Sequence, residues 1–169
     1  MHFDPSLVYT HADSPLGDMI LAATRLGLAG IWFDDQRHLP DMRGWTRRDD
    51  DPLLLRAATQ LREYFAGKRQ QFELPLDLHA GTAFQQSVWQ ALLGIATGRT
   101  TSYGAIGRQI GKPAAMRAVG AAVGRNPLGI VVPCHRVLGA DGSLTGYAGG
   151  LERKRFLLDL EEPVAATLF

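Results

Sequence analysis

The sequence lacks three features that would assign it to a familiar class. Its single cysteine among 169 residues excludes an internal disulfide framework. Its five histidines are scattered and no Cys-x-x-Cys pair occurs, so no zinc site is recognisable. No apolar stretch approaches the length of a membrane span, and the N-terminus has neither the basic start nor the apolar segment of a signal peptide. These absences predict a cytoplasmic protein with a free thiol, no metal and no membrane contact.

The composition is that of an ordinary packed protein. Apolar residues make up 46% of the chain and charged residues 21%, which is enough apolar material to bury a core. The formal net charge is +1 at pH 7. This total neither favours nor excludes a polyanionic partner, because a local basic patch acts even when the sum is near zero.

The first 78 residues are expected to form a small N-terminal domain. Short β-prone segments at 8–12, 18–23 and 28–33 are separated by Gly- and Pro-containing turns, which predicts an antiparallel meander. The charged stretch 37–52 is typical of a surface loop. A linker containing Pro75 then leads to a boundary near Leu78.

One helix is predicted within that half. Asp51 before Pro52 supplies an N-cap and a proline at the first helical position, and Gly67 ends the helix. Its apolar stripe should cover the meander and consists of Leu54, Ala58, Leu61 and Phe65.

Residues 79–169 are expected to be mainly helical. Thr82 and Gln85 form a capping box that opens a helix ending at Gly98, and its Phe84 and Trp89 are assigned to the core rather than to a cofactor site. A short helix capped by Ser102 and a second one starting at Lys112-Pro113 suggest a helix-turn-helix, although any αα-hairpin looks similar. The predicted class is therefore α/β (α+β), a small antiparallel sheet with one helix followed by a helical domain.

The second of these helices is almost bare of large side chains. A bare helix permits close approach of another backbone, which suits either tight core packing or the reading of a narrow groove. One long cation, Arg117, stands on it and would suit the second alternative. The small residues are Ala114, Ala115, Ala118, Gly120, Ala121, Ala122 and Gly124.

The only cysteine, Cys134, stands in the stretch "IVVPCHRV". The β-branched run before Pro133 predicts a strand that ends there and holds the thiol at a corner. The cysteine is either a structural core thiol or one activated by His135, because a nearby base lowers a thiol pKa. Neighbours in a strand point to opposite faces, so the pair needs a bridging water or a local turn.

Glu161 in the closing helix could orient the imidazole of His135 as the third member of a Cys-His-carboxylate set. By itself Glu161 is more typical of a solvated helix charge.

Three motifs, "RAVGAAVGRNP", "PCHRV" and "GYAGG", together closely resemble the O6-alkylguanine-DNA alkyltransferase family, also called methylated-DNA–protein-cysteine methyltransferases. The likeness covers residues 81–161, and the first half fits only in length and in its meander-plus-helix character. It implies DNA repair by direct reversal, in which the alkyl group of O6-alkylguanine passes irreversibly to a cysteine after base flipping, with O4-alkylthymine as a second candidate substrate. It also implies no cofactor, a single turnover, and a monomer that binds double-stranded DNA through the minor groove.

The resemblance gives catalytic roles to four residues. Cys134 is the acceptor, His135 the water-mediated base, and Glu161 the carboxylate that orients the base. Asn126 matches a hinge asparagine between the recognition helix and the active-site strand.

The same resemblance names substrate and DNA contacts. Tyr103 crowds the phosphate backbone, Tyr147 faces the flipped base, and Val137 and Ala148 contribute backbone groups to it. Arg117 is the finger that fills the gap in the duplex, and the further DNA contacts are Ser102, Ala118 and Gly120.

Two departures from the family pattern concern the width of the alkyl pocket. Ala148 stands where many relatives have serine, and Gly129 where some have proline. Glycine gives a benzyl ring no rigid face to lie against, so reaction with O6-benzylguanine is expected to be slow.

The sequence is also compatible with two other functions. The protein could bind lesions without transferring the alkyl group, or it could be a cysteine hydrolase that uses Cys134 and His135. An acceptor gives a stoichiometric burst that stops, whereas a hydrolase turns over.

Overall fold

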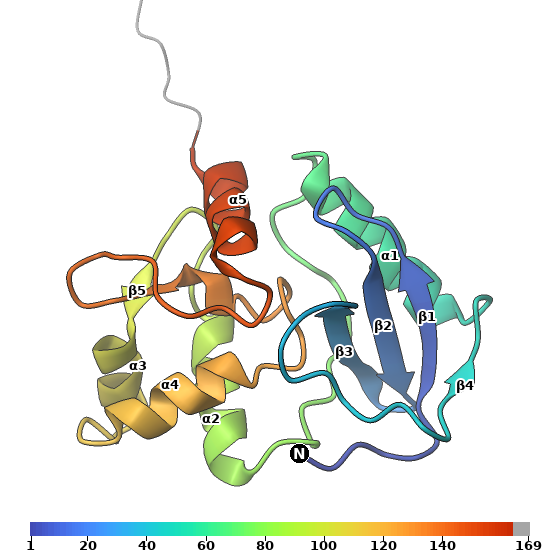
Figure 1. Cartoon of the computed structure of the whole chain (residues 1–169), viewed down its shortest axis with the longest axis horizontal. Helices are drawn as coiled ribbons and strands as arrows, with labels where there is room; N and C mark the ends of the chain where they lie inside the picture. Colours follow the sequence, from blue (N-terminus) through green and yellow to red (C-terminus); the bar gives the residue numbers. More distant parts are fainter. Residues whose placement is uncertain (164–169) are drawn as a thin grey trace, which may run out of the picture.

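The computed structural model describes residues 1–163, which form a β-rich half and a helical half side by side (Figure 1). The predicted α/β class, with a small sheet first and helices after it, is confirmed. No helix in residues 1–163 is both long and apolar enough to cross a bilayer.

The sheet is the antiparallel meander that the turn spacing predicted, with one addition. Strands β1 (Val8–Ala12), β2 (Met19–Thr24) and β3 (Gly27–Phe33) pair in chain order. The stretch 37–52 is not wholly irregular, because β4 (Thr46–Arg47) pairs in parallel with β1. The resulting order β3-β2-β1-β4 leaves β3 at the edge that faces the helical half.

Helix α1 (Pro52–Phe65) lies along one face of this sheet (Figure 1). The predicted cap is present, with Asp51 Oδ1 accepting from Leu54 N at 3.0 Å. The buried stripe is rotated relative to the prediction, because Ala58 and Phe65 are only half-buried while Tyr64 is 2% exposed. This rotation directs a tyrosine, rather than a phenylalanine, into the interior between the halves.

The helical half contains four α-helices and two short strands among the described residues. The capping box of Thr82 and Gln85 is present, but the helix that it opens ends at Leu93, because Gly94 serves as its C-cap ahead of the expected Gly98. The elements are α2 (Ala83–Leu93), β5 (Thr101–Ser102), α3 (Tyr103–Gln109), α4 (Met116–Gly124), β6 (Val137–Leu138) and α5 (Leu151–Glu161).

Helices α3 and α4 pack against each other as a helix-turn-helix would. Gly111 forms the turn with a φ of +73°. The start of the second helix was predicted wrongly, because residues 112–115 form turns and α4 begins only at Met116. The proline at position 113 therefore stands in the connection and not in the first turn of the helix.

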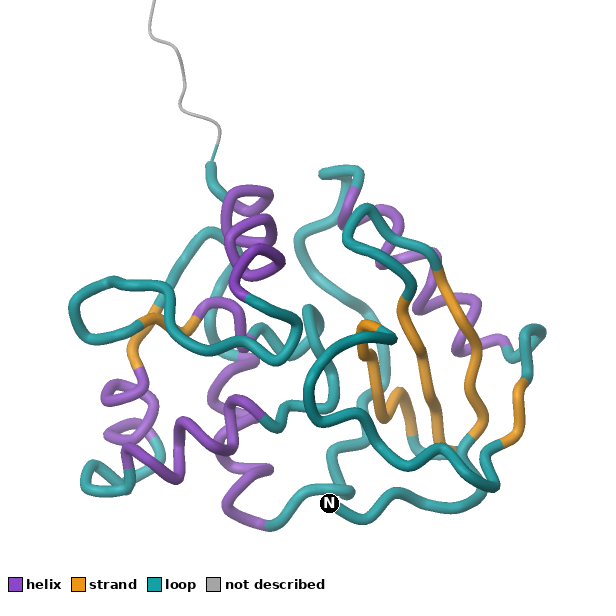
Figure 2. Tube along the Cα trace, viewed as in Figure 1, coloured by secondary structure: helices purple, strands orange, loops and turns teal. Residues whose placement is uncertain are grey.

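The strand predicted before Pro133 does not form. Residues 127–129 instead pair with the edge of β3, where Ile31 N donates to Pro127 O at 2.8 Å and Gly129 N donates to Ile31 O at 3.3 Å. The chain then turns at Ile130, which has a φ of +74°, and enters the short 3-10 helix η1 (Cys134–Arg136). Its β-branched residues are buried as core packing rather than paired in a sheet, so the stretch between α4 and α5 is mostly loop (Figure 2).

The two halves share one hydrophobic core. It joins Leu28 and Ile31 of the sheet to Leu61 of α1, and these to Trp89 of α2 and Val132 before the cysteine. Trp89 is fully buried and donates from Nε1 to Ala122 O at 2.8 Å, as a core role requires. The division into domains at 1–78 and 79–169 stays a prediction.

The Gly129–Ile31 hydrogen bond generates a prediction about proline at this position. Gly129→Pro removes the N–H that donates to Ile31 O, so the free energy of unfolding should fall by about 1 kcal/mol, or roughly 2–4 °C in Tm. Gly129→Ala is the control, because it keeps the N–H and places its Cβ at 3.4 Å from Ile31 O. Thermal melts of the three proteins test this, and equal melting temperatures for the proline variant and wild type would contradict it.

Candidate active site around Cys134

Cys134 begins η1 and lines a small cavity. Its amide N donates to Val132 O at 2.8 Å, and the residue is 8% exposed. The cavity measures about 20 Å³, which is room for about one water molecule. Its walls are Gln36, Val123, Gly124, Asn126, Gly129, Gly146, Tyr147, Ala148 and Gly149.

The thiol is held in its protonated form. Burial raises the pKa of Cys134, and a contact with the Asn126 amide and the charge of Lys154 offset only part of that effect. A protonated thiol is a poor nucleophile, so reaction at this sulfur requires a base that removes the proton.

His135 is the base that the structure provides. The side chain is fully buried, and Nε2 lies 2.7 Å from Glu161 Oε1. An ionised carboxylate only accepts, so Nε2 carries the proton and Nδ1 carries the free lone pair. Burial also lowers the pKa of His135 despite the neighbouring Glu161, which keeps the ring neutral.

The free nitrogen of His135 is distinctive. Among buried side-chain nitrogen and oxygen atoms of residues 1–163, Nδ1 alone has no hydrogen-bond partner. No direct bond between the side chains of Cys134 and His135 occurs in the described chain, although η1 replaces the expected strand with a local turn. The resting thiol and imidazole are therefore both neutral, and no ion pair joins them.

Glu161 accepts hydrogen bonds from three side chains. Its carboxylate receives Tyr64 Oη at 2.7 Å and two bonds from Arg136, with Nε and Nη2 both at 2.8 Å, in addition to His135. The side chain is 2% exposed, so the interpretation as a solvated helix charge is wrong. Burial raises the pKa of Glu161, but the hydrogen bonds outweigh it and bring the pKa to about 2.

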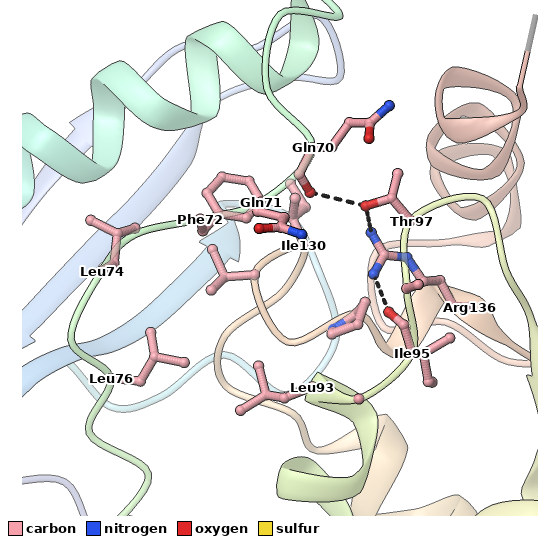
Figure 3. A pocket seen from close by; sticks show the side chains of 14 residues that line it. Gln70, Gln71, Phe72, Leu74, Leu76, Leu93, Ile95, Thr97, Ile130 and Arg136 are labelled. Carbon is pink, nitrogen blue, oxygen red and sulfur yellow. Dashed lines mark hydrogen bonds between the residues drawn. The ribbon is translucent and has the colours of Figure 1, made fainter.

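Arg136 extends this network to the other half of the chain. Nη1 donates to Ile95 O at 2.6 Å and Nη2 to Thr97 Oγ1 at 3.2 Å, and Thr97 in turn donates to Gln70 O at 2.9 Å (Figure 3). Figure 3 also shows the groove of about 520 Å³ between the linker and the end of α2, which is separate from the cavity at the thiol. Sequence reasoning gave Arg136 no role of its own.

Lys154 is a second residue that sequence reasoning missed. It is fully buried on α5, and Nζ donates to Val137 O and Thr145 O at 2.6 Å and to Gly146 O at 3.4 Å. It therefore ties the loop that carries Tyr147 to the helix that carries Glu161. A signal was present in the sequence, because Lys154 lies three residues before the buried Leu157 and seven before Glu161, on one helical face.

Asn126 is brought to the site as a clamp on the turn before the cysteine. Nδ2 donates to Val132 O at 2.7 Å, and Oδ1 accepts from Leu128 N at 3.0 Å. Both ends of its amide therefore hold residues 128–132 in place. Asn126, the residue predicted to be a hinge, lies where α4 joins this turn.

Of the three residues expected to contact the base, Tyr147 and Ala148 line the cavity and Val137 does not. The hydroxyl of Tyr147 stays protonated, because burial raises its pKa. The Ala148 carbonyl accepts from Arg37 N at 3.0 Å. The Val137 carbonyl already accepts from Lys154, so one of its two lone pairs is in use.

The expected DNA contacts lie on α3 and α4 rather than in the cavity. Ser102 caps α3, with Oγ accepting from Ala105 N at 3.1 Å, and Tyr103 Oη accepts from Thr145 Oγ1 at 3.3 Å. Arg117 and Ala118 are exposed on α4, while Gly120 is half-buried facing Tyr103. The structure thus groups them on a second surface beside the thiol site.

This surface is basic. Arg108, Lys112, Arg117 and Arg125 are all exposed, and none of the ion pairs among residues 1–163 involves them. Four uncompensated cations around two short helices give a local positive field despite a net charge of +1.

The matching family models and the two relatives below all carry the description of one protein family. Residues 83–163 match the family model "6-O-methylguanine DNA methyltransferase, DNA binding domain", and residues 7–78 match the ribonuclease-like domain of the same name. A methylated-DNA–protein-cysteine methyltransferase of Mycobacterium tuberculosis is 49% identical over 164 residues, covering 95% of this chain and 98% of that protein. One from Haemophilus influenzae is 42% identical, covering 93% and 87%.

The fold is similar to a solved structure as well. The crystal structure of Mycobacterium tuberculosis OGT in complex with DNA superposes with a TM-score of 0.84 at 49% identity, over 92% of each chain.

The buried carboxylate generates a prediction about pH. The pKa of Glu161 is about 2 in the folded protein against an ordinary 4.5, so its contribution, on the order of 3 kcal/mol, is complete above pH 4.5 and is lost as the pH falls toward 2. Glu161→Gln should destabilise the protein at neutral pH by about 3–5 kcal/mol, because it leaves Arg136 buried and unpaired. The difference from wild type should shrink on acidification.

Urea titrations across this pH range measure that difference. Glu162→Gln is the matched control, because the neighbouring carboxylate is exposed and should make little difference. A constant gap between wild type and Glu161→Gln at all pH values would refute the assignment.

Proposed function

Because this chain belongs to the methylated-DNA–protein-cysteine methyltransferase family and repairs DNA by moving an alkyl group onto a cysteine, we propose that Cys134 is the acceptor. One observation carries this assignment: the chain contains a single cysteine, so no other thiol can take the group. Cys134 lines a small cavity, and the next residue in the chain is a neutral histidine that can take up the thiol proton.

The transfer can be written with the groups at hand. The sulfur lone pair attacks the alkyl carbon of O6-alkylguanine and the carbon–oxygen bond breaks, with its electrons staying on the guanine. The thiol proton passes to Nδ1 of His135, through a water where the two do not touch, and Glu161 stabilises the imidazolium that forms. Guanine takes up one proton as it leaves. We assign the Tyr147 hydroxyl as the donor, and the proton held by His135 then replaces it on the phenolate, so that overall the thiol proton ends on guanine.

The product explains why the protein acts once. A thioether has no hydrolytic exit, and the arrangement supplies no second nucleophile in the cavity, since its other walls are backbone, apolar groups, amides and a tyrosine. We expect no cofactor to take part, because a thiolate attacking an activated alkyl carbon needs none.

We place the minor groove of double-stranded DNA on the α3–α4 surface. The small exposed residues of α4 allow a backbone to come close, and the four uncompensated cations suit phosphates on both sides of the groove. Arg117 on this helix is the side chain that enters the stack when the damaged nucleotide is extruded, and Tyr103 turns the phosphate backbone. Extrusion costs least for a badly paired base, which favours the lesion without base-specific contacts.

We further propose that the protein acts as a monomer in the cytoplasm. O4-alkylthymine is a second candidate substrate.

The acceptor assignment predicts the behaviour of a serine variant. Cys134→Ser should abolish transfer of a labelled methyl group from DNA but leave DNA affinity within a few fold, because the phosphate contacts lie on other residues. Intact-protein mass before and after reaction measures the transfer, and gel-shift titration measures the affinity. One added methyl per wild-type molecule is expected. Label on the serine variant would refute the assignment, and continued turnover by wild type would indicate a hydrolase.

The role of Arg117 predicts a dependence on the substrate. Arg117→Ala should slow transfer from a methylated duplex by about tenfold or more, yet leave reaction with free O6-methylguanine base almost unchanged, because only the duplex must be opened. Arg62→Ala removes the same charge from the outer helix α1 and is the matched control. Equal slowing on duplex and free base would contradict the role in extrusion.

A further inference from the structure

The cavity at Cys134 is not built from the helical half alone. One of its walls is Gln36, which lies in the turn that follows β3 in the β-rich half. Figure 1 shows this loop curving from the sheet toward the helical half. Gln36 is the one wall residue that comes from the first half of the chain, and its side chain is half-buried at the edge of the cavity.

Both ends of the Gln36 amide are used to hold the side chain in place. Oε1 accepts from Phe33 N at 2.9 Å, and Nε2 donates to Arg37 O at 3.2 Å. The backbone closes the same turn, with Gln36 N donating to Phe33 O at 3.2 Å. A glutamine bonded at both amide atoms gives the cavity a wall of defined position rather than a mobile surface side chain.

The turn itself is clamped to the helical half on both sides of Gln36. Arg37 N donates to Ala148 O at 3.0 Å, and Asp35 accepts from Arg153 Nη1 at 2.7 Å. The Arg153 guanidinium lies 4.2 Å from the centre of the Phe33 ring, and its Nε donates to Leu16 O at 3.0 Å. Arg153 belongs to α5, the helix that also carries Lys154 and Glu161.

Two other wall residues of the cavity are also held in place by hydrogen bonds. Asn126 is fixed by two backbone partners, and Gly129 is hydrogen-bonded to β3. The whole space is about 20 Å³, so any substrate must widen it on entry. The clamp on the turn keeps Gln36 from moving aside when this happens.

We propose that Gln36 is a specificity-determining residue that limits the size of the alkyl group accepted by Cys134. This inference rests on the proposed function, since it assumes that the thiol is the acceptor. Gln36→Ala removes the four outermost heavy atoms of this wall and should admit a benzyl group that the wild type accepts slowly. A pocket discriminates between alkyl groups differing by one methylene by roughly 10–200-fold, so the gain should be at least about tenfold.

The experiment uses the full chain and two duplexes, one carrying O6-methylguanine and one O6-benzylguanine. The rate of each transfer is measured by intact-protein mass, and the readout is the ratio of the benzyl rate to the methyl rate. Gln36→Ala should raise this ratio at least about tenfold. Gln36→Glu keeps the shape of the side chain and its acceptor for Phe33 N and loses only the bond to Arg37 O, so the ratio should rise far less than in Gln36→Ala.

Asp35→Ala distinguishes the effect of the Gln36 side chain from the effect of the position of its turn. It removes the ion pair with Arg153 but keeps Gln36 and the bond from Arg37 N to Ala148 O that also holds the turn, so the ratio should stay at the wild-type value. A ratio unchanged in Gln36→Ala, or raised equally in Asp35→Ala, would overturn the proposal. Failure of the proposed function looks different, because wild type would then gain no mass from the methylated duplex at all.

Discussion

The carboxylate of Glu161 is the interaction on which the rest of the site depends. A buried charge is unstable unless hydrogen-bonded partners surround it, and this one is surrounded by Tyr64 from α1, His135 and Arg136 from η1. These partners come from both halves of the chain, so the network forms only when the halves are packed together. The Glu161 carboxylate that orients His135 is therefore stable only in the completely folded protein.

This network determines the state of the reactive pair. Burial acts in opposite directions on the two groups, because it raises the pKa of Cys134 and lowers that of His135. The resting thiol and imidazole are consequently both neutral, and this pair becomes charged only while the proton moves. Glu161, which accepts from His135, and Lys154, which donates to three carbonyl groups, both stand on α5, so this one helix supplies two buried ionisable residues to the site.

The β-rich half takes part in the site at three places. Tyr64 reaches the carboxylate, the edge of β3 binds the turn before the cysteine through Ile31, and Gln36 forms a wall of the cavity. A continuous core joins the halves behind these contacts. The first half is thus a structural component of the thiol site as well as a neighbour of it.

The sequence by itself determined what depends on local chemistry: the meander, the cap at Asp51, the turn at Gly111, and the single thiol next to a histidine. Predictions were wrong where the structure depends on contacts with residues distant in the sequence. The β-branched run before Cys134 was taken for a strand, yet residues 127–129 occupy the edge of β3 and the run fills the core. Burial of Glu161 and Lys154, and the wall formed by Gln36, were decided only by the tertiary structure, because a charge or amide is buried only where distant residues supply its hydrogen bonds.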